Sequence, residues 1–352
     1  MSQPDTIAVR PDERFDERAL AEWLRGRLPG AEAPLAVRQF GGGAANLTYL
    51  LDYGDREYVL RRPPLGPVAP SAHDMGREFR VLSALHPAFP AAPQAFVFCD
   101  DPALIGAPFF VMERRTGVVT RKSIPPAFAD LPDAPRRMSE ALVDALADFH
   151  AVDPAAIGLE TLGKPAGFLE RQIEGWHGRW HKAKLEDLPA MDEVHEWLVA
   201  RRPRSSAVSL VHNDYKLDNV MFAADDPSRL IAVFDWDMCT LGDPLADLGT
   251  LLCYWSQPDD DPMFQLASMM PVGDLGFLRR DELVARYARR SGRDVAEIDF
   301  YHVLGLYRLA VIAAQIFIRF HRGQTQDARF AAFGPMIAVV AQAARALTLR
   351  AA

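Results

Sequence analysis

Two short apolar segments near the middle of the chain, VMF (220–222) and LIAVF (230–234), are bordered by runs of polar residues. Before the first lies LVHNDYKLDN (210–219), where Asn and Asp cluster as they do in loops, because their side chains bond to nearby backbone and disfavour a helix interior. After the second lies DWD (235–237). The turn AADDPSR (223–229) joins the apolar segments, so we expect a hairpin that brings both polar runs to one end.

This hairpin predicts a cluster of oxygen-bearing side chains, with Asp214 and Asn219 near Asp235. Carboxylates crowded together are costly unless a cation or a proton neutralises them. Hard oxygen ligands with few protein contacts suit Mg²⁺, which keeps water and substrate phosphates in its coordination shell. We therefore expect a metal-dependent catalytic site on this loop and hairpin.

Composition narrows the class of protein. The chain has 352 residues, of which 49% are hydrophobic and 24% charged, enough for one large core or two packed lobes. The net charge of -8 does not suggest a nucleic-acid partner. The scattered Cys99, Cys239 and Cys253 argue against a disulfide framework. The polar N-terminus does not resemble a signal peptide, and charged residues interrupt the apolar stretch 303–320, so we predict a cytoplasmic protein without a membrane span.

Before Gly117 the pattern alternates between strands and helices. A leading helix ends in Pro-Gly, a three-strand meander with a glycine-rich first turn follows, and another helix precedes two further strands. In chain order these expected elements are the helix 12–30, the strands 34–40, 48–54 and 56–64, the helix 71–86, and the strands 94–100 and 108–114.

After Gly117 the pattern becomes mainly helical, with amphipathic helices expected at 133–152, 168–184 and 191–202 and mostly helix from about residue 280. This change of pattern predicts two domains. We expect an N-terminal lobe at 1–113, which includes the leading helix 12–30, and a C-terminal lobe at 114–352.

The motif H-x-D-x-x-x-x-N at 212–219, followed by an Asp after a short strand, resembles the catalytic core of the protein-kinase-like superfamily. Together with DWDMCTLGDPLADLG (235–249), it resembles the aminoglycoside phosphotransferase and choline kinase-like family, and especially the kinase-like domain fused to some acyl-CoA dehydrogenases. The resemblance implies an α+β, bilobal fold. A small antiparallel sheet with one helix would bind ATP, and a larger, mainly helical lobe would carry catalysis and bind the acceptor.

The resemblance also implies roles for single residues. Asp214 matches the catalytic Asp that accepts the proton of the substrate hydroxyl, and Lys216 lies where many such enzymes place a lysine against the transferred phosphate. Asn219 and Asp235 match ligands of Mg²⁺. Asp237 is a second acid that would contact a metal ion or a water, or form an ordinary hydrogen bond. His212 and Asp247 are expected to brace the loop backbone rather than to act on substrate.

In the N-terminal lobe the turn GGGAAN (41–46) is neither a Walker A loop nor G-x-G-x-x-G. Its backbone N–H groups would approach phosphates, or it is a plain hairpin turn. Arg61 stands where related kinases carry a phosphate-binding lysine, with Glu78 as its partner on a helix; the alternative is a surface salt bridge. The residues expected to bind ATP are Gly41, Gly42, Gly43, Asn46, Arg61, Glu78 and, in the connection between the lobes, Met112, Glu113 and Arg114.

These features favour a kinase that uses ATP and Mg²⁺ to phosphorylate a hydroxyl of a small molecule. Two alternatives stay open: a kinase-like protein that binds a nucleotide or ligand without transfer, and an aminoglycoside-resistance kinase. The rather basic LRRDELVARYARRSGRD (278–294) does not suit a polycationic acceptor. The resemblance to the dehydrogenase-fused domain implies a hydroxyacyl-CoA instead.

One further pair of motifs lies on a predicted helix. His177 and His181, like Trp176 and Trp180, are four positions apart and therefore share a helix face. A zinc site would need a third ligand, which the sequence does not designate. An aromatic wall beside the acceptor pocket and ordinary packing are the other interpretations of these residues.

Overall fold

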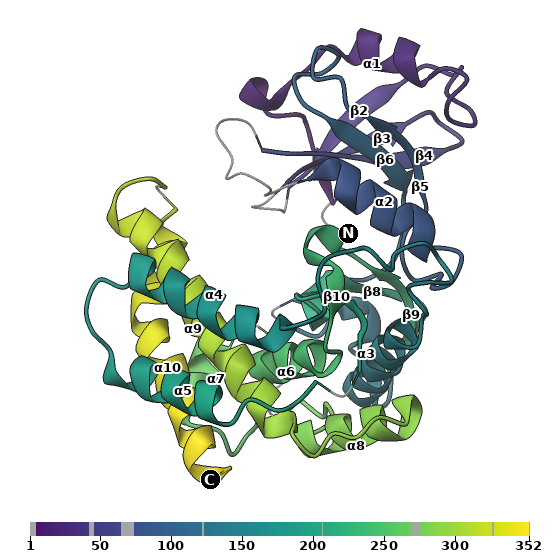
Figure 1. The fold of residues 1–352 in the computed structure, drawn as a ribbon. Coiled ribbons are helices and arrows are strands. Elements are labelled where there is room, and N and C mark those ends of the chain that lie inside the picture. The colour runs from purple at the N-terminus through teal and green to yellow at the C-terminus, as the bar shows by residue number, and fades with distance from the viewer. Residues whose placement is uncertain are drawn as a thin grey trace. The chain divides into compact units, whose positions relative to one another are not determined.

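The computed structural model describes residues 5–41, 46–64, 74–121, 123–205, 207–268, 270, 275–325 and 327–351. The chain forms two compact units (Figure 1). The first consists of Met1–Thr116 with Ala232–Cys239, and the second of Gly117–Ile231 with Thr240–Ala352. The sequence pattern placed the division at 113/114 and assigned 232–239 to the C-terminal part, whereas this segment belongs to the first unit.

Two contacts explain why Ala232–Cys239 belongs to the first unit. The backbone N–H of Val233 donates to the carbonyl of Ala91 at 2.8 Å. The buried Trp236 lies edge-on to Phe89, with ring centroids 6.3 Å apart. These contacts join residues far apart in the chain, so no local pattern could have indicated them.

The first unit is built on one antiparallel sheet with the strand order β1-β2-β3-β4-β6-β5. The expected meander and the two later strands are present; the two-residue β1 was too short to be predicted. The strands are β1 (Thr6–Ile7), β2 (Ala36–Phe40), β3 (Leu47–Asp52), β4 (Glu57–Arg62), β5 (Ala95–Cys99) and β6 (Phe109–Glu113).

In the described part of this unit, the helices beside the sheet are α1 (Glu17–Leu24) and α2 (Met75–Leu85). The prediction of one helix over 12–30 was wrong, because Pro11–Glu13 forms a separate 3-10 turn and the Asp16 side chain starts α1 by accepting the Ala19 N–H at 2.9 Å.

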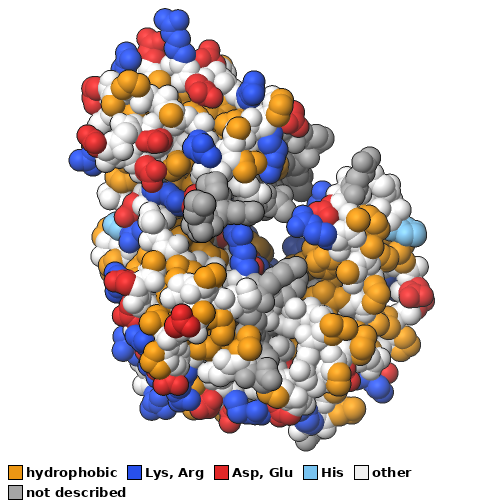
Figure 2. Space-filling model, turned by 180° about the vertical axis from the view of Figure 1, so that it is seen from behind, with side chains coloured by type: hydrophobic (Ala, Val, Ile, Leu, Met, Phe, Trp, Pro, Cys, Tyr) orange, Lys and Arg blue, Asp and Glu red, His pale blue; other side chains and the backbone are white. Residues whose placement is uncertain are grey.

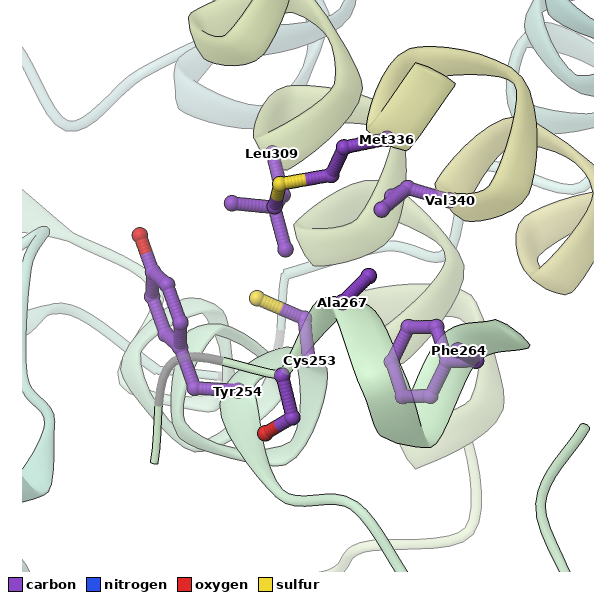
Figure 3. A pocket seen from close by; sticks show the side chains of 8 residues that line it. Cys253, Tyr254, Phe264, Ala267, Leu309, Met336 and Val340 are labelled. Carbon is purple, nitrogen blue, oxygen red and sulfur yellow. The ribbon is translucent and has the colours of Figure 1, made fainter. Parts of the chain in front are cut away.

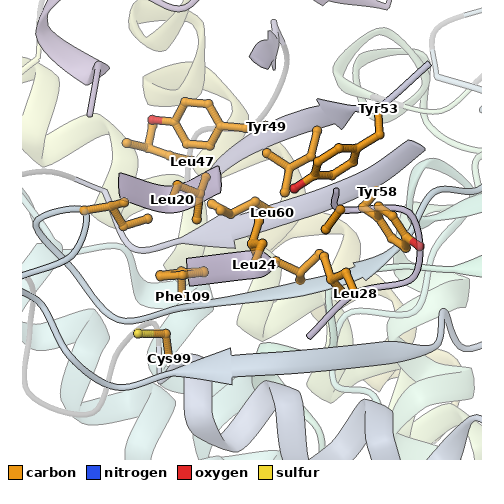
Figure 4. Close-up of a cluster of buried hydrophobic side chains, with 14 residues drawn as sticks. Leu20, Leu24, Leu28, Leu47, Tyr49, Tyr53, Tyr58, Leu60, Cys99 and Phe109 are labelled. Carbon is orange, nitrogen blue, oxygen red and sulfur yellow. The ribbon is translucent and has the colours of Figure 1, made fainter. Parts of the chain in front are cut away.

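Side chains along β4 alternate between the two faces of the sheet, so neighbouring residues make different contacts. Leu60 belongs to a buried cluster that includes Leu20 and Leu24 of α1 as well as Tyr49 and Phe109 (Figure 4). Because successive strand residues point to opposite faces, Arg61 points away from this cluster. The face that carries Arg61 is the one against which α2 packs, through Phe79.

The second unit is mainly helical. It also holds two small antiparallel pairs, β7 with β10 and β8 with β9. The β8–β9 pair confirms the hairpin expected from VMF and LIAVF. The helices are α3 (Ala134–His150), α4 (Phe168–Ala183), α5 (Pro189–Ala200), α6 (Leu245–Tyr254), α7 (Pro262–Ala267), α8 (Arg280–Ser291), α9 (Ile298–His321) and α10 (Phe333–Arg350); the strands are β7 (Ser209–Val211), β8 (Val220–Ala223), β9 (Asp226–Val233) and β10 (Thr240–Gly242).

Helix α9 forms the centre of this unit and packs against α6, α10 and α4 (Figure 1). Its contact with α6 depends on two glycines. A Cβ at Gly249 would lie 2.3 Å from the carbonyl oxygen of Tyr301, and one at Gly305 would lie 2.6 Å from the carbonyl oxygen of Gly249. The two backbones therefore approach closely, which fixes the position of α6.

Among the described residues, two helical stretches have the length and composition to cross a membrane, Ile298–His321 and Ala328–Arg350. The most apolar part of the first is 67% buried within the protein's own fold, as expected for a core helix, whereas that of the second is 22% buried. On the face shown in Figure 2, acidic, basic and apolar side chains are intermixed. The absence of a membrane span therefore stays a prediction.

Candidate active site

One buried carboxylate, that of Asp247, holds the backbone of the loop between β7 and β8. Asp247, in the first turn of α6, accepts the backbone N–H groups of His212 at 2.6 Å and Asn213 at 2.7 Å. His150 Nε2 lies 3.1 Å from the same carboxylate, and Tyr287 bonds the other ring nitrogen of His150 at 2.7 Å. Burial opposes the charge of Asp247, but the hydrogen bond and charge of His150, together with the charge and backbone N–H of His212, outweigh it and lower the pKa of this carboxyl. The expected bracing role of Asp247 is confirmed.

The two residues before Asp214, His212 and Asn213, set the course of the loop backbone. Asn213 has a φ of 65°, in the left-handed region that Asn tolerates better than most residues. The ring nitrogen Nδ1 of the fully buried His212 accepts the N–H of Asp214 at 3.2 Å. His212 therefore braces the loop, as expected.

Asp214, Lys216 and Asn219 form one cluster in the second unit. The ammonium of Lys216 lies 3.1 Å and 2.8 Å from the two carboxylate oxygens of Asp214. The amide nitrogen of Asn219 donates to the backbone oxygen and to Oδ2 of Asp214, both at 2.9 Å. Because the nitrogen of this amide is used in these bonds, its oxygen is the atom suited to a cation. The side chains of Asp214 and Lys216 are 20% and 17% exposed, so substrate could reach them.

Two residues beside this cluster were missed by the sequence reasoning. The ring of Tyr254, at the end of α6, lies 5.1 Å from the ammonium of Lys216. Asp218 lies 3.9 Å from the same ammonium, and burial raises its pKa although Lys216 lowers it. Burial also opposes the charge of Lys216, but Tyr254, Asp214 and Asp218 outweigh it and raise the pKa of the ammonium. The only available signal was that Asp218 lies inside the motif.

A second charged cluster, the Arg61 cluster (Arg61, Glu78 and Asp235), lies in the first unit. The guanidinium of Arg61 contacts Glu78 Oε2 through Nε at 3.2 Å and Asp235 Oδ1 through a terminal nitrogen at 2.5 Å. Arg61 is 8% and Glu78 1% exposed, so this is not a surface salt bridge. Burial raises the pKa of Glu78 to about 7, against the attraction of Arg61. Asp235 follows β9 in the left-handed region, with a φ of 68°.

Asp237 lies on the short 3-10 turn Trp236–Met238 that follows Asp235. Its charge contributes to the raised pKa values of Glu78 and Arg61, so it lies close to the Arg61 cluster. Its contact with a metal ion or a water stays a prediction.

The remaining candidates of the first unit are placed as follows. Gly42 and Gly43 lie outside the described residues; Gly41 is exposed and Asn46 is buried. Met112 is buried on β6. The carboxylate of Glu113 pairs with Arg115 at 2.8 Å, and Arg114 pairs with Asp5 and lies over the ring of Phe40. The side chains of Glu113 and Arg114 are thus engaged within the unit, and a role in adenine binding would fall to the backbone.

The candidate residues therefore form two sets. Asp214, Lys216 and Asn219 come together in the second unit, and Arg61, Glu78 and Asp235 come together in the first. That Asp235 joins Asp214 and Asn219 around a metal ion stays a prediction.

Comparison with known proteins identifies the relatives of this chain. Residues 36–301 match the model of the family described as "Phosphotransferase enzyme family". Acyl-CoA dehydrogenase family member 11 of Rattus norvegicus is 34% identical over 330 residues, which are 92% of this chain and 42% of the relative. Acyl-CoA dehydrogenase family member 10 of Mus musculus is 32% identical over 329 residues, 92% of this chain and 30% of the relative. The chain spans less than half the length of these curated relatives.

Solved structures agree with the fold. A protein of Ralstonia eutropha, solved as a candidate aminoglycoside phosphotransferase, has 30% identity and a TM-score of 0.81, with 96% of this chain and 99% of that chain covered. An ethanolamine kinase of Plasmodium vivax shares the fold at 12% identity and a TM-score of 0.59, with 87% and 82% covered. The fold class and the resemblance expected from the sequence are confirmed.

Proposed function

Because the chain belongs to the phosphotransferase enzyme family, we propose that it uses ATP and Mg²⁺ to phosphorylate a hydroxyl group of a small molecule. The observation that carries this proposal is the cluster of Asp214, Lys216 and Asn219. It joins a partly exposed carboxylate to a cation and to an amide whose oxygen is suited to a metal ion. Phosphoryl transfer needs such positioning and charge neutralisation more than covalent chemistry.

Asp214 would orient the acceptor hydroxyl and take its proton. The bonds from Lys216 and Asn219 hold the carboxylate in one orientation, and general-base catalysis of this kind contributes roughly 10²–10⁴ in rate. Lys216 keeps its proton, since its pKa is raised, and would neutralise the transferred phosphate.

The donor set fits Mg²⁺. The amide oxygen of Asn219 and the carboxylates of Asp235 and Asp237 are hard oxygen ligands, few enough that the ion would keep water and phosphate oxygens in its shell. When bound, Mg²⁺ would neutralise charge on the phosphates of ATP. Arg61 would hold Asp235 in place rather than act as a free phosphate ligand, because Glu78 and Asp235 both pair with its guanidinium.

The acceptor we propose is a hydroxyacyl-CoA. A small pocket begins at Tyr254, whose ring also contacts Lys216 (Figure 3). The pocket holds only about 10 Å³ of space, so an acyl chain would enter by displacing flexible side chains such as Met336. Its lining carries no carboxylate among the described residues, which does not suit a polycationic aminoglycoside. The lining consists of Cys253, Tyr254, Phe264, Ala267, Ser268, Leu309, Met336 and Val340.

The names of the relatives also support an acyl-CoA acceptor, since they are acyl-CoA dehydrogenases that are longer than this chain. The engagement of Arg61 by two carboxylates favours, as a second candidate, a protein that binds nucleotide without transfer.

The test is a screen of 3-, 4- and 5-hydroxyacyl-CoAs, free hydroxy acids and aminoglycosides with ATP and Mg²⁺, with the phosphorylated product detected by mass spectrometry. We expect product from a hydroxyacyl-CoA with the wild-type chain and none above background with Asp214→Asn. Nucleotide binding without any phosphorylated product would support the non-catalytic alternative, and product from aminoglycosides alone would overturn the proposed acceptor.

A further inference from the structure

A cluster of imidazoles lies on α4 and α5, away from the candidate active-site residues in sequence. The ring nitrogens Nε2 of His177 and His181 lie 2.9 Å apart. The structure adds His195 of α5, whose ring stacks on that of His177 with centroids 3.5 Å apart and an angle of 9° between the planes. His195 Nε2 lies 3.7 Å from a carboxylate oxygen of Glu174. The third ligand that the sequence did not designate thus comes from the neighbouring helix.

We propose that Glu174, His177, His181 and His195 form a binding site for a divalent transition-metal ion, above all Zn²⁺, which links α4 to α5. Three residues of this set, at positions i, i+3 and i+7 of α4, share one helix face, and the fourth faces them from α5. Three imidazoles and one carboxylate are nitrogen and oxygen donors of the kind that zinc takes in four-coordinate sites. The site is independent of the proposed phosphotransferase function.

Two pairs of donor atoms already lie near the separation that a shared zinc ion requires. Zinc–ligand bonds of about 2.0–2.1 Å in a tetrahedron separate any two ligand atoms by about 3.3 Å. The two measured donor pairs, at 2.9 Å for His177 with His181 and 3.7 Å for His195 with Glu174, lie on either side of that separation. The stack of His177 on His195 brings the two pairs together.

One rearrangement is required. A metal ion lies in the plane of each imidazole that binds it, so the parallel rings of His177 and His195 cannot share an ion until one of them turns. In keeping with this, the described part of the chain contains no set of three such ligands already converged on one point. Nε2 of His195 is buried and has no hydrogen-bond partner among the described residues, so its rotation breaks no hydrogen bond at that atom. Glu174 is 61% exposed at its side chain and can follow.

An outer partner already orients one ligand. The hydroxyl of the fully buried Tyr307 bonds Nδ1 of His177 at 3.0 Å, which leaves Nε2 facing His181. Ligand histidines usually have such a partner on the second nitrogen. A metal ion would replace the single proton that His177 and His181 share.

The test uses the chain without an added histidine tag, freed of metal and titrated with Zn²⁺ by calorimetry and with Co²⁺ by visible absorption. We expect one equivalent of Zn²⁺, a tetrahedral Co²⁺ spectrum and a metal-dependent rise in the melting temperature. His195→Gln should weaken zinc binding roughly 100-fold, and Tyr307→Phe by about 10–100-fold, the usual effect of removing an outer partner. The control His321→Gln removes an exposed imidazole from the end of α9 and should bind zinc like the wild type.

His181→Gln, at an exposed position, gives the same test if His195→Gln fails to fold. The proposal is overturned if the wild-type chain binds no zinc, or if the variants at 195 and 181 bind it as tightly as His321→Gln. A failed phosphotransferase assay would leave these results unchanged.

Discussion

The two charged clusters of this protein are built in opposite ways. In the first unit the cation Arg61 is almost buried between the carboxylates of Glu78 and Asp235. In the second unit the cation Lys216 holds both oxygens of one carboxylate, Asp214, and both side chains remain partly exposed.

The difference in burial between the two clusters predicts different effects on stability and on activity. A buried charge that loses its partner is strongly destabilising, whereas an exposed pair contributes little to stability. We therefore expect changes in the Arg61 cluster to affect folding first and changes in the Asp214 cluster to affect catalysis first.

The largest expected effect is that of Asp214→Asn on turnover. The amide keeps the size of the side chain but cannot accept a proton, so kcat should fall roughly 10²–10⁴-fold. Urea unfolding should give a free energy within about 1 kcal/mol of the wild type, because the ion pair of Asp214 with Lys216 is partly exposed and such pairs contribute little to stability. A loss of several kcal/mol in unfolding free energy would remove the contrast between the clusters.

Arg61→Met should destabilise the first unit by about 3 kcal/mol, because it leaves the buried Glu78 without its cation. The matched control is Arg229→Met. Arg229 pairs with Asp225 at 2.9 Å, but the two side chains are 59% and 79% exposed, so the cost should stay below about 1 kcal/mol. Equal unfolding free energies for the two variants in urea titrations would contradict the assignment.

Gly305→Ala tests the close contact between α9 and α6 in the second unit. A Cβ at this position would lie 2.6 Å from a backbone carbonyl of α6, the helix that carries Asp247, so we expect a loss of about 1–3 kcal/mol from overpacking. The control Gly178→Ala, in a helix and with nothing within 4 Å of its Cβ, should stabilise by about 0.5–1 kcal/mol. Thermal unfolding of both variants measures the difference, and similar melting temperatures would exclude the close helix contact.

Local pattern was sufficient for part of this structure. The hairpin followed from apolar segments bordered by polar runs. The pairing of Arg61 with Glu78 was expected from the resemblance to the protein-kinase-like superfamily rather than from local pattern. By contrast, Arg61 and Asp235 are 174 positions apart, and His195 meets His177 across two helices. Strands of three residues, such as β7 and β10, are also too short to show a period. Such contacts arise from tertiary packing, which spacing along the chain does not encode.

The last prediction concerns pH. Burial raises the pKa of Glu78 from 4.5 to about 7 on folding, so the folded chain holds this proton where the unfolded chain has released it. The stabilisation from the protonated carboxyl is complete below pH 4.5 and is lost as the pH rises to about 7. Glu78→Gln cannot titrate, so its unfolding free energy relative to the wild type should increase across this range. Lys216, whose pKa is raised, keeps its charge throughout. Urea unfolding of both proteins at steps between these pH values measures the difference, in which other titrating groups cancel. Parallel curves would show that folding leaves the pKa of Glu78 unshifted, with Arg61 fully compensating its burial.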